Sequence, residues 1–174
     1  FCFFNNVAVG ARHALDVHGL QRVAIIDFDV HHGNGTEDII AGDERVLMCS
    51  FFQHPLYPFS GAVPKGTNMV NVPVEPYTRG AELREIIDAM WMPELERFAP
   101  QMLFISAGFD AHREDDLGQL GLVEADYAWM TQRLMDVAER HAQGRIVSCL
   151  EGGYALSALA RSVTAHLRVL ADVA

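Results

Sequence analysis

Acids and histidines gather in one short stretch of this chain, directly after an apolar run. Residues 22–26 are apolar, short and without alternation, which is typical of a buried parallel strand. Residues 27–36 follow with the sequence DFDVHHGNGT. Asp29 and His31 are two residues apart and can point the same way from an extended segment. Carboxylate and imidazole groups together suit a divalent metal of the zinc or iron type. A solvated loop is the alternative, but the density of polar groups favours a site.

Two more predicted strands end in side chains that could take part in the same chemistry. Asp110 follows the apolar residues 101–107, and Tyr154 follows residues 145–150. The carboxyl ends of parallel strands lie at one edge of a sheet, where ligands collect. Two carboxylates and one imidazole could bind one metal and leave a position open, as in catalytic zinc sites. The Tyr154 hydroxyl could then donate a hydrogen bond to a developing oxyanion.

The elements that must position these residues alternate between strand and helix. The pattern predicts strands at residues 22–26, 45–52, 69–74, 101–107 and 145–150, and helices at residues 5–20, 36–41, 81–98, 123–138 and 156–170. This alternation predicts an α/β fold in which a mostly parallel sheet carries helices on both faces, in three layers. We expect Pro93 to kink or end its helix. Residues 53–68 have no periodicity and form a long loop, a feature that is often functional.

Length and composition narrow the class of protein. The 174 residues fit one domain, so residues 1–174 are expected to be a single unit. A net charge of −10 argues against a surface for nucleic acid or for an anionic membrane. Cys49 and Cys149 lie in apolar runs and are expected to be reduced core residues. No apolar run approaches 18 residues and no cysteine framework suggests secretion, so we expect a cytoplasmic protein, with a homo-oligomer as an open possibility. The apolar start FCFF predicts a fragment with structure upstream.

Four blocks of this sequence resemble those of the histone deacetylase superfamily. They are residues 1–6 (FCFFNN), 27–36, 106–112 (SAGFDAH) and 151–154 (EGGY), and they cover nearly the whole chain. Asn34, Phe109 and Glu151 resemble the class II and bacterial branch. The related arginases use a two-metal site with a different Asp/His pattern, which this sequence lacks. The resemblance implies an arginase/deacetylase-like fold, of which this chain would be the C-terminal part.

The resemblance also implies roles for individual residues. Asp29, His31 and Asp110 match zinc ligands, and Tyr154 matches the residue that stabilises the oxyanion. Asp27 and Asn34 match the hydrogen-bonding partners of a histidine pair that the family carries upstream of this sequence, one of which is the general base. A structural K⁺ site is implied, with ligands from Asp27, Asp29, His31, Ser50 and Phe51. The residues that match the acyl-lysine tunnel are Phe1, Tyr57, Leu117, Gly152 and Gly153.

The reaction that the resemblance implies is zinc-dependent hydrolysis of N-acyl amides. Leu117 stands where polyamine deacylases of the class II branch carry glutamate, so an acetyl-lysine protein or peptide is favoured as substrate. Asp115 and Asp116 are expected in a solvated loop, although either could add negative charge at the tunnel rim. The alternatives are an amidohydrolase for acetylpolyamines or other small acetylated amines, and a non-catalytic module that binds metal or acyl ligands. Without the upstream histidines, these 174 residues alone are expected to be inactive.

The remaining histidines lack a partner in the motifs and are expected at the surface or close behind the site. They are His54, His112, His141 and His166. His13 and His18 are expected at the surface or at the edge of the core, and His32 is expected to be a hydrogen-bonding neighbour of the site rather than a metal ligand.

Overall fold

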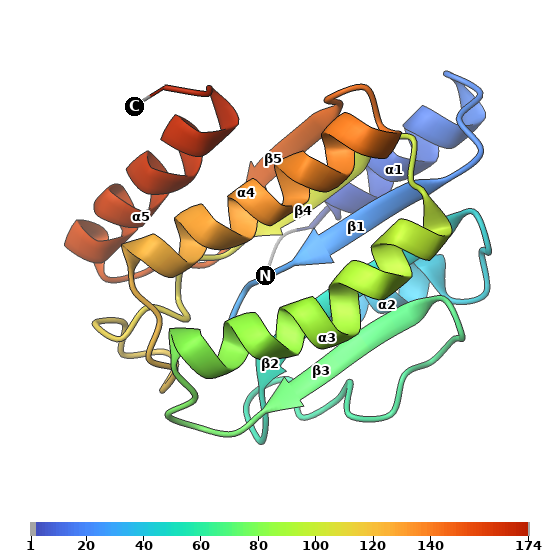
Figure 1. Ribbon diagram of the computed structural model, residues 1–174. Helices are drawn as coiled ribbons and strands as arrows, with labels where there is room; N and C mark the ends of the chain where they lie inside the picture. Colours follow the sequence, from blue (N-terminus) through green and yellow to red (C-terminus); the bar gives the residue numbers. More distant parts are fainter. Residues whose placement is uncertain (1–2, 174) are drawn as a thin grey trace.

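The computed structural model describes residues 3–173, which form a five-stranded sheet with helices on both faces (Figure 1). The strand order is β3-β2-β1-β4-β5, and every pairing is parallel. The strands are β1 (Val23–Asp27), β2 (Val46–Gln53), β3 (Met69–Val74), β4 (Leu103–Ala107) and β5 (Ile146–Leu150). The helices are α1 (Asn6–Asp16), α2 (Asn34–Ile40), α3 (Gly80–Phe98), α4 (Glu124–His141) and α5 (Leu156–Leu170).

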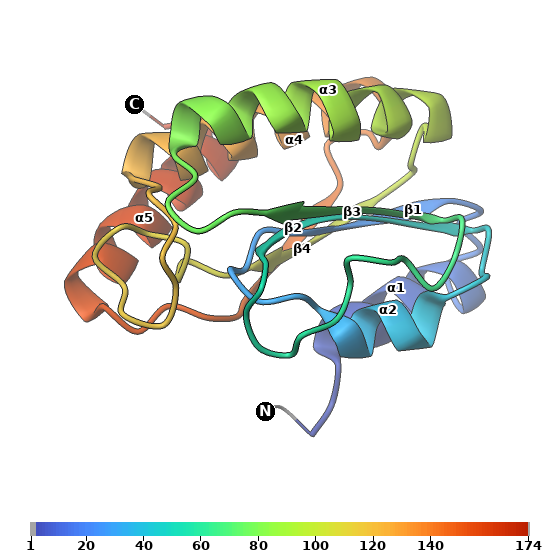
Figure 2. The same cartoon turned by 90° about the horizontal axis from the view of Figure 1, so that it is seen from below.

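The sheet forms the middle of three layers (Figure 2). Helices α3 and α4 cover one face with α5 beside α4, and helices α1 and α2 cover the other. Successive residues of β1 supply the two cores: Ala24 and Ile26 pack toward α3 and α4, whereas Val23 and Ile25 pack toward α1. This explains why the run is apolar without alternation. The predicted three-layer α/β architecture is confirmed.

The register of the central strands sets the position of the polar segments. Asp27, the last residue of β1, lies opposite Ser50 of β2 and Ser106 of β4. Ala107 at the end of β4 lies opposite Leu150 at the end of β5. The segments that leave β1, β4 and β5 therefore start at the same edge of the sheet, as the sequence predicted.

Pro93 does not end its helix, because α3 runs through it from Gly80 to Phe98. Pro93 and Ala89, whose carbonyl loses its intrahelical partner, are both exposed, so water can solvate the freed carbonyl. Trp91 and Leu95 on the other side of the helix are buried in the core and anchor both halves. Packing therefore overrides the local preference of proline.

Two of the four histidines expected at the surface or close behind the site are buried. His112 and His166 are 1% and 2% exposed. Nδ1 of His166 lies 2.6 Å from the Thr131 hydroxyl and Nε2 lies 2.9 Å from the Ser148 hydroxyl. Burial lowers the pKa of His166 to about 4, so the ring is neutral and held by hydroxyl groups from α4 and β5. Cys149 is only half-buried, whereas Cys49 is in the core as expected.

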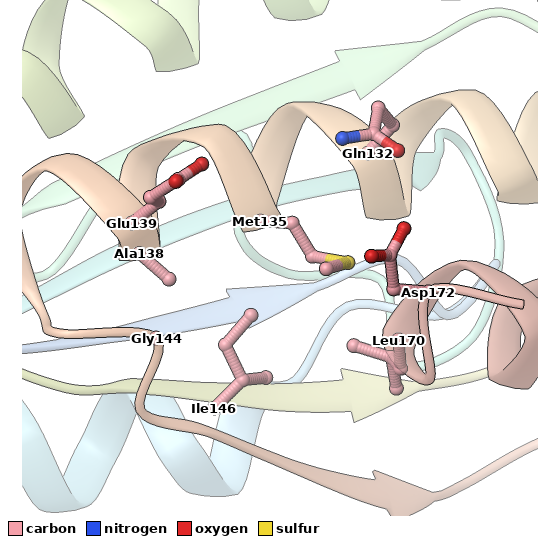
Figure 3. Close-up of a pocket in the computed structure, with 8 residues that line it drawn as sticks. All are labelled: Gln132, Met135, Ala138, Glu139, Gly144, Ile146, Leu170 and Asp172. Carbon is pink, nitrogen blue, oxygen red and sulfur yellow. The ribbon is translucent and has the colours of Figure 1, made fainter.

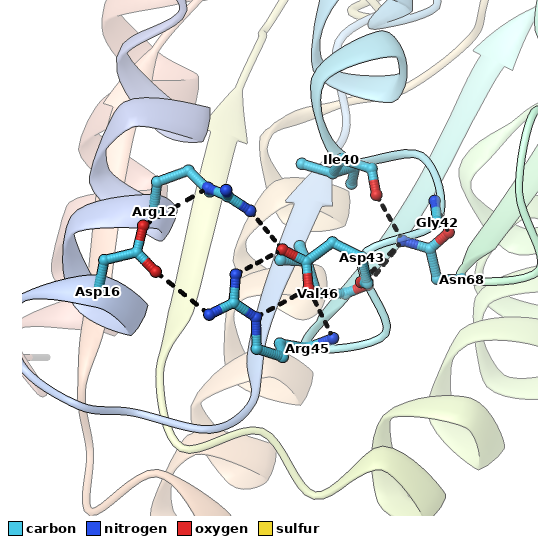
Figure 4. Close-up of polar contacts among 8 residues, drawn as sticks. All are labelled: Arg12, Asp16, Ile40, Gly42, Asp43, Arg45, Val46 and Asn68. Carbon is cyan, nitrogen blue, oxygen red and sulfur yellow. Dashed lines mark hydrogen bonds and ion pairs between the residues drawn. The ribbon is translucent and has the colours of Figure 1, made fainter.

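Asn68 fastens the loop before β3 to the segment that connects α2 with β2 (Figure 4). Its side-chain amide donates to the backbone carbonyls of Ile40 (2.9 Å), Asp43 (3.3 Å) and Val46 (3.0 Å). Its amide oxygen accepts from the Gly42 N–H at 3.2 Å. One polar side chain thereby satisfies four backbone groups of a tight connection.

Candidate metal centre

Three side chains at the carboxyl edge of the sheet converge on one point. Asp29 and His31 follow β1, Asp110 follows β4, and their ligand atoms all lie within 4.8 Å of one another. His31 Nδ1 is 3.1 Å from Asp29 Oδ1 and 3.2 Å from Asp110 Oδ2. Asp110 is fully buried, and its Oδ1 accepts a hydrogen bond from the Val30 N–H at 2.9 Å. The predicted triad therefore forms from residues 81 positions apart at most.

The two carboxylates of this triad favour a positive charge at its centre. The neighbouring Asp110 and Asp29 carboxylates raise the pKa of His31 to about 10. Burial, together with the charge of Asp29, raises the pKa of Asp110 to about 6, although His31 opposes this shift. Without a metal, a proton on His31 balances two carboxylates that burial would otherwise leave unpaired. A bound cation would take over the role of that proton.

Two glycines give the carboxylates the room that they need. A Cβ atom at Gly152 would lie 2.0 Å from Asp110 Oδ2 and 2.6 Å from Asp29 Oδ2. A Cβ atom at Gly108 would lie 2.3 Å from Asp29 Oδ2. The Gly152 N–H donates to Asp29 Oδ2 at 2.9 Å, and the Gly152 carbonyl accepts from the Phe109 N–H at 2.8 Å. The segment after β5 thus packs directly against the carboxylates and holds Asp29 in place.

The donor set fits a zinc ion. Oδ2 of Asp110 is buried and faces Nδ1 of His31 at 3.2 Å without a hydrogen bond of good geometry, so both atoms are placed to coordinate one ion. Two carboxylates and one imidazole are ligands that zinc accepts, and three protein ligands leave a position for water or substrate.

Behind the triad, Asp27 and Ser50 lie side by side and are both buried. Oδ1 of Asp27 accepts the Asp29 N–H at 3.1 Å. Burial, and then the acids Asp29, Glu151 and Asp110, raise the pKa of Asp27 well above its usual range. Phe51 follows Ser50 in β2 and is also buried. The K⁺ site predicted around these residues stays a prediction.

The predicted tunnel residues lie at several places around the triad. The ring of Tyr57 meets that of His31 edge to face, with centroids 6.5 Å apart. Leu117 and Tyr154 are about half exposed, and Gly153 precedes Tyr154 with a φ of +141°. Asn34 is exposed at the start of α2. The prediction for Phe1 lies outside the described residues.

His32 and Glu37 form a buried pair next to the triad, and the sequence predicted a role for His32 alone. His32, expected to be a hydrogen-bonding neighbour of the site, pairs through Nε2 with Glu37 of α2 at 2.9 Å. Both side chains are 1% exposed. Glu37 also accepts from Asn71 (2.8 Å) and from the Lys65 N–H (3.2 Å). Glu37 had no signal in the sequence beyond its spacing of five from His32, yet it fastens the long loop that carries Tyr57.

Asp115 contradicts the expectation of a solvated loop, because it is only 4% exposed. Its carboxylate accepts hydrogen bonds from three backbone N–H groups, those of Leu117, Tyr154 and Ala155. Asp116 beside it is exposed, as expected. A buried acid therefore joins the loop after Asp110 to the segment that carries Tyr154.

The open groove shown in Figure 3 is separate from the triad. It has a volume of about 430 Å³ and lies between α4, the first residue of β5 and the end of α5. Because Ile146 begins β5, this groove is at the opposite edge of the sheet from the triad. None of the described helices is long and apolar enough to cross a membrane.

The fold and the triad together define a class: α/β proteins with a carboxylate–imidazole triad that could hold a metal ion at the carboxyl edge of a parallel sheet. Comparison with known proteins identifies the family. The histone deacetylase domain matches residues 1–170, so the chain belongs to that family.

Similar proteins and solved structures support the same family assignment. The chain is 41% identical over 162 residues to a "Probable deacetylase" of Archaeoglobus fulgidus, covering 90% of this chain and 45% of the relative. It is 40% identical over 161 residues to a "Histone deacetylase-like amidohydrolase" of Pseudomonas aeruginosa, covering 88% of this chain and 42% of the relative. The crystal structure of the HDA15 HD domain superposes with a TM-score of 0.89 at 35% identity, covering 99% of this chain and 50% of that one. The chain thus spans about half the length of these proteins.

Proposed function

We propose that this chain supplies the zinc site and the oxyanion-stabilising tyrosine of an enzyme that hydrolyses N-acyl amides, with acetyl-lysine in a protein or peptide as the preferred substrate. The observation that carries this proposal is the triad of Asp29, His31 and Asp110, whose ligand atoms converge around a fully buried Asp110 carboxylate. The names of the relatives, a deacetylase and an amidohydrolase, support the same reaction class.

Each residue has a distinct task in this mechanism. Asp29, His31 and Asp110 would hold the zinc ion, which supplies Lewis acidity to an acyl carbonyl and lowers the pKa of a bound water. The Tyr154 hydroxyl would donate a hydrogen bond to the oxyanion that develops on the substrate. Proton transfer would fall to the histidine pair that the family resemblance implies upstream of Phe1.

The residues around the triad support an aliphatic acyl-lysine chain as ligand. Tyr57 presents its ring edge to face with His31, so an aromatic surface borders the triad. Leu117 adds a half-exposed apolar side chain in the loop after Asp110. An apolar wall suits the methylene chain of an acylated lysine better than the cationic amines of a polyamine. We further propose that Asp27, Ser50 and Phe51 contribute to a K⁺ site, because the charges nearest to Asp27 are acids.

The test of the reaction uses the complete protein and an acetyl-lysine peptide. Hydrolysis is expected, with loss on removal of metal by a chelator and recovery on addition of zinc. Tyr154→Phe should lower kcat by about 10²–10³ with zinc content unchanged. A metal-loaded protein without hydrolytic activity on any acylated amine would leave the non-catalytic module as the better interpretation.

The test of substrate choice compares kcat/KM for the peptide with kcat/KM for N-acetylputrescine and N8-acetylspermidine. We expect the peptide to be preferred, and Leu117→Glu to shift the ratio toward the polyamines, because a carboxylate at the rim attracts their distal amines. An enzyme that is tenfold better on either polyamine would assign the protein to the small-amine amidohydrolases instead.

A further inference from the structure

Asp115 is a buried acid with no part in the chemistry described so far. It lies five residues after the metal ligand Asp110 and two before Leu117. Its side chain is shielded from solvent, yet no arginine, lysine or histidine among the described residues pairs with it within 4 Å. A buried carboxylate needs strong partners, and the partners here are backbone N–H groups.

The two oxygens of Asp115 connect two segments of the site. Oδ2 accepts from the N–H of Tyr154 at 2.7 Å and from the N–H of Ala155 at 3.0 Å. Oδ1 accepts from the N–H of Leu117 at 3.0 Å. The carboxylate thus contacts the backbone of both the proposed oxyanion donor and the rim residue. It also lies at the entry to α5, whose own N-cap residue Ala155 provides no capping side chain.

Without this contact, the backbone of Tyr154 would have considerable freedom. Two glycines precede it, and Gly153 has a φ of +141°, which only glycine adopts readily. Gly152 is fixed by its hydrogen bonds with Asp29 and Phe109. The next fixed points along the chain are the N–H groups of Tyr154 and Ala155, both held by Asp115. The starting point of the Tyr154 side chain is therefore set by Gly152 on one side and by Asp115 on the other.

The loop that carries Asp115 is itself anchored. The Asp115 N–H donates to the His112 carbonyl at 2.9 Å, and the Glu114 N–H donates to Nδ1 of the buried His112 at 3.1 Å. The Glu114 side chain pairs with Arg161 of α5 at 2.8 Å, and Arg161 also pairs with Glu124 at the start of α4. Hydrogen bonds to the buried His112 and an ion pair to Arg161 thus hold the loop at Asp115, as a positioning residue requires.

We propose that Asp115 is the positioning residue of Tyr154. Its carboxylate fixes the backbone from which the tyrosine side chain reaches the reacting carbonyl. The same carboxylate binds the N–H of Leu117 and so positions the tunnel rim relative to Tyr154. This inference rests on the proposed function, in which Tyr154 donates to the oxyanion. A shift of about 1 Å in a catalytic group can cost on the order of 10² in rate. The loss should therefore appear in kcat rather than in zinc binding.

The experiment measures kcat, KM and zinc content of the complete zinc-loaded protein and of Asp115→Asn, Tyr154→Phe and the double variant. Asp115→Asn replaces one of the two accepting oxygens by an NH2 group, so at least one of the three backbone N–H groups loses its acceptor and faces a donor, and the negative charge is removed. We expect it to lower kcat by about ten- to a hundredfold, with KM within about threefold and zinc content unchanged. In the Tyr154→Phe background, the same substitution should lower kcat by less than about twofold, because the tyrosine that it positions has no hydroxyl to misplace. Asp88→Asn, which breaks an exposed ion pair with Arg133 of α4, is the matched control and should leave kcat unchanged.

The outcomes separate this proposal from the proposed function. If Tyr154→Phe retains full kcat, the role of Tyr154 fails. If Tyr154→Phe is impaired but Asp115→Asn retains full kcat, or if the two effects multiply, Asp115 does not act through the tyrosine and the positioning role is overturned.

A second variant covers the case in which Asp115→Asn does not fold. Ala155 has a φ of −79°, which proline can adopt, so Ala155→Pro removes one N–H donor to Asp115 and leaves the carboxylate in place. We expect a kcat that is lowered at least threefold with zinc retained, and an unchanged kcat would overturn the proposal. Loss of zinc and of a cooperative unfolding transition in both variants would also overturn it, because Asp115 would then hold the fold rather than the tyrosine.

Discussion

Gly152→Ala tests whether the segment after β5 shapes the metal centre. The added Cβ would lie 2.0 Å from Asp110 Oδ2 and 2.6 Å from Asp29 Oδ2, whereas ordinary contacts begin near 3.4 Å. To relieve this overlap, a carboxylate or the backbone must move by more than about an ångström, while metal–ligand distances tolerate only about 0.2 Å. Asp110 is fully buried and cannot swing into solvent. We expect zinc affinity to fall at least ten- to a hundredfold, as for loss of a group that orients a ligand.

The assay is a competition titration of zinc against a chromophoric chelator, with thermal unfolding recorded on the same samples. Gly35→Ala is the matched control, because its nearest new contact would be an Asn5 nitrogen 3.9 Å away. The control should bind zinc like the unaltered protein. A folded Gly152→Ala protein with undiminished zinc affinity would show that the metal does not lie between Asp29 and Asp110.

Two further predictions concern stability. Asn68→Ala should lower the free energy of unfolding by about 1–3 kcal/mol in a denaturant titration, because three backbone carbonyls lose their donor. Asn68→Asp should lower the free energy of unfolding further, since it turns a carboxylate toward those carbonyls. Equal losses of unfolding free energy in the two variants would contradict this role of the Asn68 amide. His166 has a pKa of about 4 in the folded protein against an ordinary 6.5, so the unfolded chain takes up its proton first and stability is lost as pH falls from about 6.5 to 4, by at most roughly 3 kcal/mol. His166→Gln should flatten that part of the stability profile measured by denaturant titration at each pH, and an unchanged slope would show that His166 is not held neutral.

Much of the fold could be predicted because its signals are local. The apolar run in β1 had to be buried on both faces, and the acids that follow it mark the point where the strand ends. Once the strands were taken as parallel, Asp29, His31 and Asp110 had to share an edge. The family motifs assigned the same three residues, and the convergence of their ligand atoms agrees with both routes.

What the sequence did not reveal depends on partners that are distant along the chain. Asp115 looks like its exposed neighbour Asp116, because the N–H groups that hold it belong to Tyr154 and Ala155, 39 and 40 residues further on. His166 was expected at the surface or close behind the site because the motifs gave it no partner. Its partners Thr131 and Ser148 come from two other elements.

Pro93 does not end its helix for a related reason. The local rule is correct about the lost hydrogen bond, but the burial of Trp91 and Leu95 outweighs it. In each of these cases tertiary packing decided the outcome, and only the three-dimensional arrangement shows which partner is present.

The most direct test of the central claim is the zinc stoichiometry of Asp110→Asn, measured by elemental analysis after dialysis on the complete protein. The substitution keeps the shape of the side chain and removes the buried charge that the zinc ion would balance. The unaltered protein and Asp88→Asn should each retain about one zinc per chain, and folded Asp110→Asn should retain little. Equal zinc content in Asp110→Asn and in the unaltered protein would contradict the assignment of Asp29, His31 and Asp110 as the metal centre.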